Sequence, residues 1–62
     1  MPVVIVEMWE GRSIEKKRLI VEGITAAFTK VGVPTEQVHI ILKDNPKNNW
    51  ASGGKLASDE VK

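Results

Sequence analysis

The feature that most limits the fold of this chain is an apolar run at residues 3–9, VVIVEMW. Its side chains are mostly β-branched or large and apolar, and Glu7 is its one charge, so the run predicts a β-strand. Successive side chains of a strand point to opposite faces, and here both faces carry mostly apolar groups. We therefore expect a strand that is covered on both sides.

A helix is expected after this strand. The segment at residues 10–13, EGRS, breaks the strand pattern, with Gly11 at a turn and Ser13 at a favourable N-cap position. From residue 14 to about residue 31 the apolar spacing becomes helical, and Gly32 stands where a C-terminal cap is expected. The sequence therefore predicts one long amphipathic helix.

Two features of this helix bear on how it packs. Gly23 lies in its interior, where glycine costs about 1 kcal/mol relative to alanine, so we interpret it as a point of close packing against another backbone. The charged side chains of the helix indicate a solvated face. The expected apolar stripe consists of Ile20, Ile24, Ala27, Phe28 and Val31.

The rest of the chain predicts a second strand and a short hairpin. Residues 38–43 form the second strand, and strand, helix and strand together predict parallel pairing with a right-handed crossover. Residues 44–49 have the composition of a loop, and Gly53-Gly54 indicates a tight turn between two short extended pieces. The polar tail at residues 58–62 is expected to fray.

These elements predict an α+β fold, in which a βαβ unit with a parallel two-stranded sheet is followed by a short C-terminal hairpin. We expect a single domain over residues 1–62. One helix covers only one face of such a sheet, so the other apolar face of residues 3–9 needs a different cover. A chain without cysteine has no disulfide, and a lone histidine with unclustered acids predicts no metal site. We therefore predict a homo-oligomer.

Charge and hydropathy exclude several classes of partner. The formal net charge is +1 with both signs interspersed, which predicts no nucleic-acid binding and no attraction to an anionic membrane. No apolar run approaches the roughly 18 residues of a membrane span, and no signal-peptide pattern is present. We expect a cytoplasmic protein.

The chain begins with Met1-Pro2, a pair that arises often by chance. Its chemistry is nevertheless distinctive. When the initiator methionine is removed, Pro2 presents a secondary amine that can accept a proton and return it. When Met1 is retained, the same nitrogen belongs to a tertiary amide and has no basicity.

Three segments carry a resemblance to a known family. Pro2, the turn at residues 10–13 and the terminal sequence GGKLAS at residues 53–58 resemble the 4-oxalocrotonate tautomerase (2-hydroxymuconate tautomerase) family. The resemblance covers essentially the whole chain, with about one residue missing in the loop before the second strand. It implies the same fold, an assembly that is most often a hexamer, and a small enol or keto carboxylate as the partner.

The resemblance also implies a cofactor-independent enol–keto isomerisation, with Pro2 as general base and then general acid after Met1 is removed. The base takes a proton from a 2-hydroxydienoate or related enol and returns it to carbon. Such a base works best when its pKa lies near the operating pH. An amine surrounded by apolar groups and cations has its charged form disfavoured, which lowers its pKa.

Arg12 and Trp50 are the substrate-binding residues that the resemblance implies. The guanidinium of an arginine grips a carboxylate through two parallel hydrogen bonds, which a lysine does not reproduce. Trp50 corresponds to an aromatic residue that walls the family's site, although a tryptophan in a polar loop also serves as a packing anchor. Trp9, at the end of the first strand, either lines the pocket likewise or only packs, and we favour packing.

His39 is where the sequence departs from the family pattern, because the best-known members carry a second arginine there. A histidine is mostly neutral at pH 7 and binds an anion more weakly, although it can still donate a hydrogen bond to an enolate oxygen. A space-filling role for His39 is an equal alternative. The change weakens the case for a dicarboxylate such as 2-hydroxymuconate, unless Lys43 or Lys47 compensates.

Two other functions stay open. One is a related activity such as dehalogenation of a 3-haloacrylate, in which a protonated proline helps to activate the substrate for attack by water. The missing second arginine argues against it. The other is a non-catalytic homo-oligomeric binding module that has kept the fold, and retention of Met1 would favour it.

Overall fold

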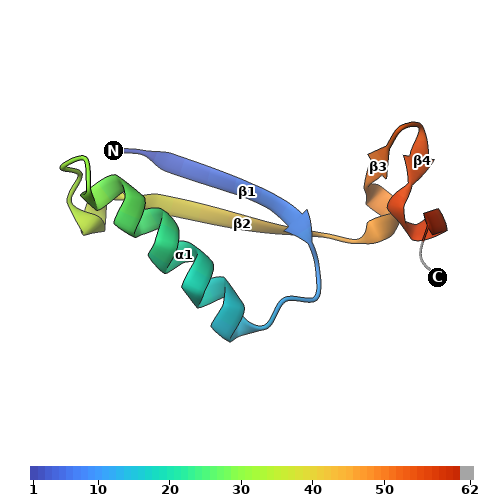
Figure 1. Cartoon of the computed structure of the whole chain (residues 1–62), viewed down its shortest axis with the longest axis horizontal. Helices are drawn as coiled ribbons and strands as arrows, with labels where there is room; N and C mark the ends of the chain where they lie inside the picture. Colours follow the sequence, from blue (N-terminus) through green and yellow to red (C-terminus); the bar gives the residue numbers. More distant parts are fainter. Residues whose placement is uncertain (61–62) are drawn as a thin grey trace.

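The computed structural model describes residues 1–60, in which a βαβ unit leads into a short hairpin that stands apart from it (Figure 1). This arrangement confirms the predicted fold class. The molecule is a flat slab with extents of 43 × 24 × 14 Å. Its elements in chain order are β1 (Val3–Trp9), α1 (Ile14–Thr29), η1 (Thr35–Gln37), β2 (His39–Asn45), η2 (Lys47–Asn49), β3 (Ala51–Ser52), β4 (Lys55–Leu56) and η3 (Ala57–Glu60), where η marks a 3₁₀ helix.

The two long strands pair in parallel over their full length, from Val3 opposite His39 to Trp9 opposite Asn45. Backbone hydrogen bonds extend the ladder at both ends. The N–H of His39 donates to the carbonyl oxygen of Pro2 at 3.0 Å, and the N–H of Glu10 donates to that of Asn45 at 2.9 Å. The residue that follows Met1 is therefore already held in line with the sheet.

The helix begins as predicted and ends earlier than predicted. Ser13 is its N-cap, and the Ser13 hydroxyl accepts a hydrogen bond from the backbone N–H of Lys16. At the other end, the backbone N–H of Val33 donates to the carbonyl oxygen of Phe28, and that of Gly32 donates to the carbonyl oxygen of Thr29. Gly32 has φ +95°. This pair of bonds is a Schellman motif, and it closes the helix at Thr29.

One packing prediction for the helix was wrong, and a second finds no partner within residues 1–60. Val31 lies beyond the helix end and is 75% exposed, so it does not belong to the apolar stripe. Gly23 does not contact another backbone within the chain, because a Cβ built there meets no atom of the described residues within 4 Å. The helix is nevertheless tied to the sheet at its amino-terminal end, where Lys17 Nζ and Asp44 Oδ2 form an ion pair at 2.6 Å.

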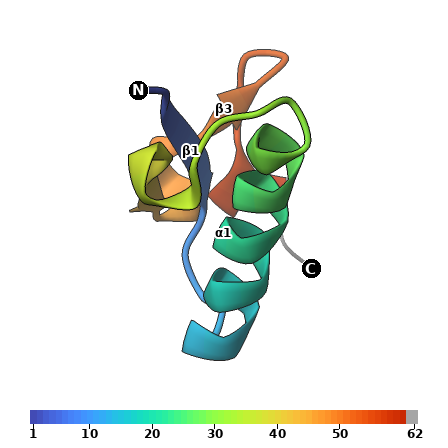
Figure 2. The same ribbon diagram turned by 90° about the vertical axis from the view of Figure 1, so that its left-hand side faces the viewer.

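The core lies on one side of the sheet only. α1 runs along one face of β1 and β2 (Figures 1 and 2), and the apolar side chains on that face are half-buried or buried. Met8, at 7% exposed, is the most enclosed hydrophobic side chain among residues 1–60. The opposite face is bare: Val3 and Ile5 are each 54% exposed and Ile41 is 46% exposed. The predicted uncovered face is therefore present.

The second half of the chain contains more regular secondary structure than the sequence predicts. β2 starts at His39 and continues through Asp44 and Asn45, which were expected in a loop. The rest of that loop contains η2, and the first part of the predicted frayed tail forms η3. The last two residues of that tail, 61–62, lie outside the described residues. No helix in the described part of the chain is long and apolar enough to cross a membrane.

Candidate functional site

Pro2 and His39 lie together at the amino-terminal end of the sheet. Pro2 is half-buried just before β1, and the backbone bond from His39 fixes its carbonyl group. His39 pairs with Val3, so its exposed side chain points to the bare sheet face, which also carries Ile5 and Ile41. The expected proton-transfer residue and the expected enolate-binding residue are thus neighbours.

Arg12 lies at the other end of β1. Gly11, at φ +115°, allows the chain to turn sharply after the strand. The turn directs Arg12 back, and its Nη1 donates a hydrogen bond to the carbonyl oxygen of Trp9 at 3.3 Å. A guanidinium has five N–H donors, so the remaining donors of Arg12 are available to a carboxylate.

Trp50 meets Trp9 at this same end of the sheet. The two indole rings form an edge-to-face pair with centroids 5.9 Å apart and planes at 76°. The turn of η2 positions Trp50 through two backbone hydrogen bonds. The backbone N–H of Trp50 donates to the carbonyl oxygen of Lys47, and the backbone N–H of Ala57 donates to the carbonyl oxygen of Trp50 at 2.7 Å. Trp50 is therefore held between η2 and η3.

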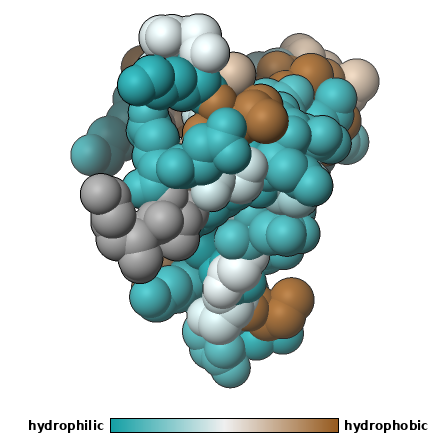
Figure 3. Space-filling model, turned by 90° about the vertical axis from the view of Figure 1, so that its right-hand side faces the viewer, coloured by the Kyte–Doolittle hydropathy of each residue, from teal (hydrophilic) through white to brown (hydrophobic). Residues whose placement is uncertain are grey.

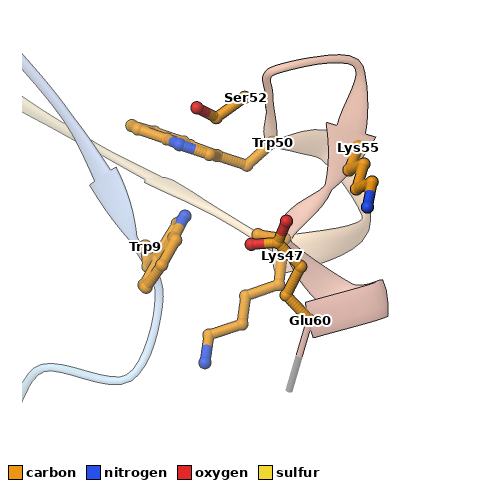
Figure 4. A pocket seen from close by; sticks show the side chains of 7 residues that line it. Trp9, Lys47, Trp50, Ser52, Lys55 and Glu60 are labelled. Carbon is orange, nitrogen blue, oxygen red and sulfur yellow. The ribbon is translucent and has the colours of Figure 1, made fainter.

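A cavity of about 360 Å³ opens beside the two indoles (Figure 4). The hairpin supplies one wall, because Gly53 and Gly54 both have positive φ and set Ser52 opposite Lys55 across a tight turn. In Figure 4, Trp9 approaches from the end of β1, and the other labelled side chains come from the C-terminal segment. The cavity is lined by Trp9, Lys47, Trp50, Ser52, Lys55, Ala57 and Glu60.

A single chain does not bring the four predicted site residues together. Pro2 and His39 stand at one end of β1, and Arg12 and Trp50 stand at the other. The seven residues of the strand, at about 3.3 Å per residue, separate the two groups by roughly 20 Å. A site with all four residues needs the opposite ends of two chains.

Sequence reasoning missed part of this cavity. Packing was favoured for Trp9 over a place in the pocket wall, whereas Trp9 both packs on Trp50 and lines the cavity. Of the two lysines considered as extra cations, Lys43 faces Glu7 at 3.9 Å, whereas Lys47 lies over the Trp9 ring with Nζ 4.8 Å from the centroid. The glycine pair in the hairpin was the one signal that Ser52 and Lys55 fold back toward Trp50.

The described part of this site contains no cluster of metal ligands. Within residues 1–60, no three histidine, cysteine, aspartate or glutamate residues lie close enough to hold an ion. The polar groups that the cavity offers are ammonium groups, a hydroxyl and one carboxylate, with indole rings beside them. Such a lining suits a small planar organic acid.

Comparison with known proteins gives consistent results. A family model described as "Tautomerase enzyme" matches residues 2–60. The chain is 41% identical over 61 residues to a "Probable tautomerase" of Lactiplantibacillus plantarum, covering 97% of this chain and 95% of that protein. It is 38% identical over 60 residues to the "2-hydroxymuconate tautomerase" of Comamonas testosteroni, covering 95% of each.

Solved structures agree with these sequence relatives. The structure of a 4-oxalocrotonate tautomerase homologue superposes with a TM-score of 0.89 at 40% identity and covers 100% of both chains. A heterohexamer 4-oxalocrotonate tautomerase from Chloroflexus aurantiacus superposes with a TM-score of 0.87 at 30% identity, covering 95% of this chain and 97% of that one. The βαβ unit with its C-terminal hairpin is therefore the fold of these proteins.

Proposed function

The chain belongs to the tautomerase family, and from this we propose that it is a cofactor-independent tautomerase of small enol carboxylic acids. The observation that carries the proposal is the position of Pro2, which precedes β1 directly and is tied to His39 by a backbone bond. Loss of Met1 would leave the Pro2 nitrogen as a terminal secondary amine at the edge of the bare sheet face. The family match also begins at Pro2.

The proposed reaction is a proton transfer in two steps. The Pro2 amine takes the hydroxyl proton of the enol, which leaves a dienolate, and then returns that proton to carbon to give the ketone. No atom is gained or lost, and no cofactor is needed. Proton transfer by a positioned group contributes about 10²–10⁴-fold in rate. Cations and hydrogen-bond donors that stabilise the dienolate oxygen and carboxylate supply much of the rest.

Arg12 and His39 are the proposed groups for that stabilisation. Arg12 is held by the Trp9 carbonyl through one N–H, which orients its guanidinium and leaves other donors for the substrate carboxylate. His39 is exposed beside Pro2, where its ring can donate to the dienolate oxygen. Trp50 would form an apolar wall that excludes water from the reacting atoms.

We infer that the site is shared between copies of the chain in a homo-oligomer, with a hexamer as the preferred assembly. The separation of Pro2 from Arg12 by the length of β1 supports a shared site, because one subunit would supply the amine and its neighbour the guanidinium. The bare face with Val3, Ile5 and Ile41 supports the association itself. Apolar surface of this kind gains free energy when a second copy covers it.

The test combines intact-mass measurement with a spectroscopic assay of enol ketonisation on wild type and Pro2→Ala. Wild type that has lost Met1 should ketonise phenylenolpyruvate or 2-hydroxymuconate faster than buffer does, and Pro2→Ala should lose most of that rate. The proposal fails if processed wild type is no faster than buffer on either compound. If Pro2→Ala keeps the full rate, Pro2 is not the base of the reaction.

A further inference from the structure

Lys47 differs from the two lysines whose ion pairs the structure shows. Lys17 pairs with Asp44 at 2.6 Å, and Lys43 lies 3.9 Å from Glu7. Within residues 1–60, no carboxylate oxygen lies within 4.0 Å of Lys47 Nζ. Its contact is with the Trp9 ring, whose face attracts a cation but does not neutralise its charge.

The indole face holds the Lys47 ammonium at one wall of the cavity. Lys47 is the first residue of η2, and its stem is half-buried along that turn. Its Nζ lies 4.8 Å from the Trp9 ring centroid, inside the range of a cation–π contact. A side chain that is already ordered in this way loses less entropy when it binds a ligand.

The cavity around this ammonium is positively charged overall. Lys47 and Lys55 contribute two positive charges and Glu60 one negative charge, which leaves the lining at +1. Ser52 adds a hydroxyl, and the two indoles form apolar walls. The surface at this end of the molecule is mostly hydrophilic, with a few apolar patches (Figure 3).

Trp9 also contacts a second cation at this end of the sheet, Arg12, which does not itself line the cavity. Arg12 bonds to its backbone carbonyl at 3.3 Å, and Lys47 lies over its ring. These cations come from segments that are 35 positions apart, yet both are held by one residue. A ligand with two anionic groups would find a cation for each of them at this end of the sheet.

We propose that Lys47 is a specificity-determining residue that binds a second anionic group of the substrate, while Arg12 binds the first carboxylate. This inference rests on the proposed tautomerase function and assigns to Lys47 the selection of substrates that carry a second anionic group. An ammonium is a compact point charge without the planar fork of a guanidinium. The second group can therefore be a planar carboxylate or a tetrahedral anion such as a phosphonate.

The test compares one substrate with two carboxylates, 2-hydroxymuconate, with one that has a single carboxylate and a neutral ring, phenylenolpyruvate. Lys47→Gln should raise KM for the dicarboxylate by about 10- to 100-fold, the range expected for loss of a charged hydrogen bond. Its KM for the monocarboxylate should change by less than about threefold. Lys47→Arg keeps the charge and should restore most of the dicarboxylate KM.

The matched control is Lys16→Gln, which removes the same charge from an exposed position on α1. It should leave both KM values unchanged. Circular dichroism and solution mass establish that each variant is folded and assembled. If wild type is active and Lys47→Gln raises neither KM, or raises both equally, the role of Lys47 is refuted while the tautomerase function stands. If wild type turns over neither compound, the proposed function itself fails.

Discussion

The backbone N–H of His39 donates a hydrogen bond to the carbonyl oxygen of Pro2 at 3.0 Å. This bond adds a rung to the parallel ladder before β1 begins, and it depends on neither side chain. The side chain at position 39 can therefore be changed without loss of the contact that holds Pro2. The bond makes the amino terminus of this small chain an ordered part of the sheet.

His39→Arg should lower KM for a dicarboxylate such as 2-hydroxymuconate and leave the fold intact. The new guanidinium would lie on the bare sheet face beside Pro2 and add a permanently charged, bidentate donor for an anionic oxygen. Steady-state kinetics on wild type and variant check this, with His39→Gln as the uncharged control. An unchanged KM would mean that the side chain at position 39 lies outside the site.

Insertion of one glycine between Met1 and Pro2 should abolish catalysis without unfolding the protein. The Pro2 nitrogen then belongs to a peptide bond and cannot accept a proton, so the rate should fall by about 10²–10⁴-fold. Intact mass identifies the terminal residue, and the ketonisation assay measures the rate. Retention of full activity would exclude the proline amine as the base.

Ile5→Lys should reduce the assembly toward a monomer of 6.9 kDa. The change places a charge at the centre of the bare apolar face, which a second copy then covers only at the cost of desolvating that charge. Light scattering after size exclusion measures the mass. Val31→Lys makes the same change at an exposed position outside the sheet and should keep the wild-type mass. Equal masses for wild type and Ile5→Lys would show that this face is not the interface.

Two glycine substitutions should shift stability in opposite directions. Gly32 has φ +95°, where an alanine is strained, so Gly32→Ala should lower the free energy of unfolding by about 1–2 kcal/mol. Gly23 is helical with open space around its Cβ position, so Gly23→Ala should raise that free energy by about 0.5–1 kcal/mol. Urea titrations at one protein concentration measure both. Destabilisation by Gly23→Ala would indicate that a neighbouring copy packs there.

The sequence predicts those parts of the fold that local pattern determines. β1 follows from its run of apolar β-branched residues, and the helix start follows from Ser13 as a cap. The extension of β2 to Asn45 does not follow from local pattern, because the Asn45 side chain donates to acceptors that are distant in sequence. Its amide donates to Glu7 Oε1 at 2.9 Å and to the Met8 carbonyl oxygen at 3.3 Å. Such partners are known only once the strands are paired.

The candidate site was predictable only in part for the same reason. Pro2, Arg12 and Trp50 stand out through family motifs that are short and local. The position of Lys47 over the Trp9 ring depends on how the C-terminal segment folds back to the end of β1. No periodicity in the sequence predicts that contact. The separation of Pro2 from Arg12 becomes clear only from the length and direction of β1.

That separation has a genetic consequence. If sites form between copies, a Pro2→Ala chain and an Arg12→Ala chain are each inactive alone but carry intact halves that complement each other. Mixed assemblies of the two should regain a fraction of the wild-type activity, because some junctions then join an intact amine to an intact guanidinium. If sites are shared, the length of one seven-residue strand thus lets two inactive chains restore each other's function.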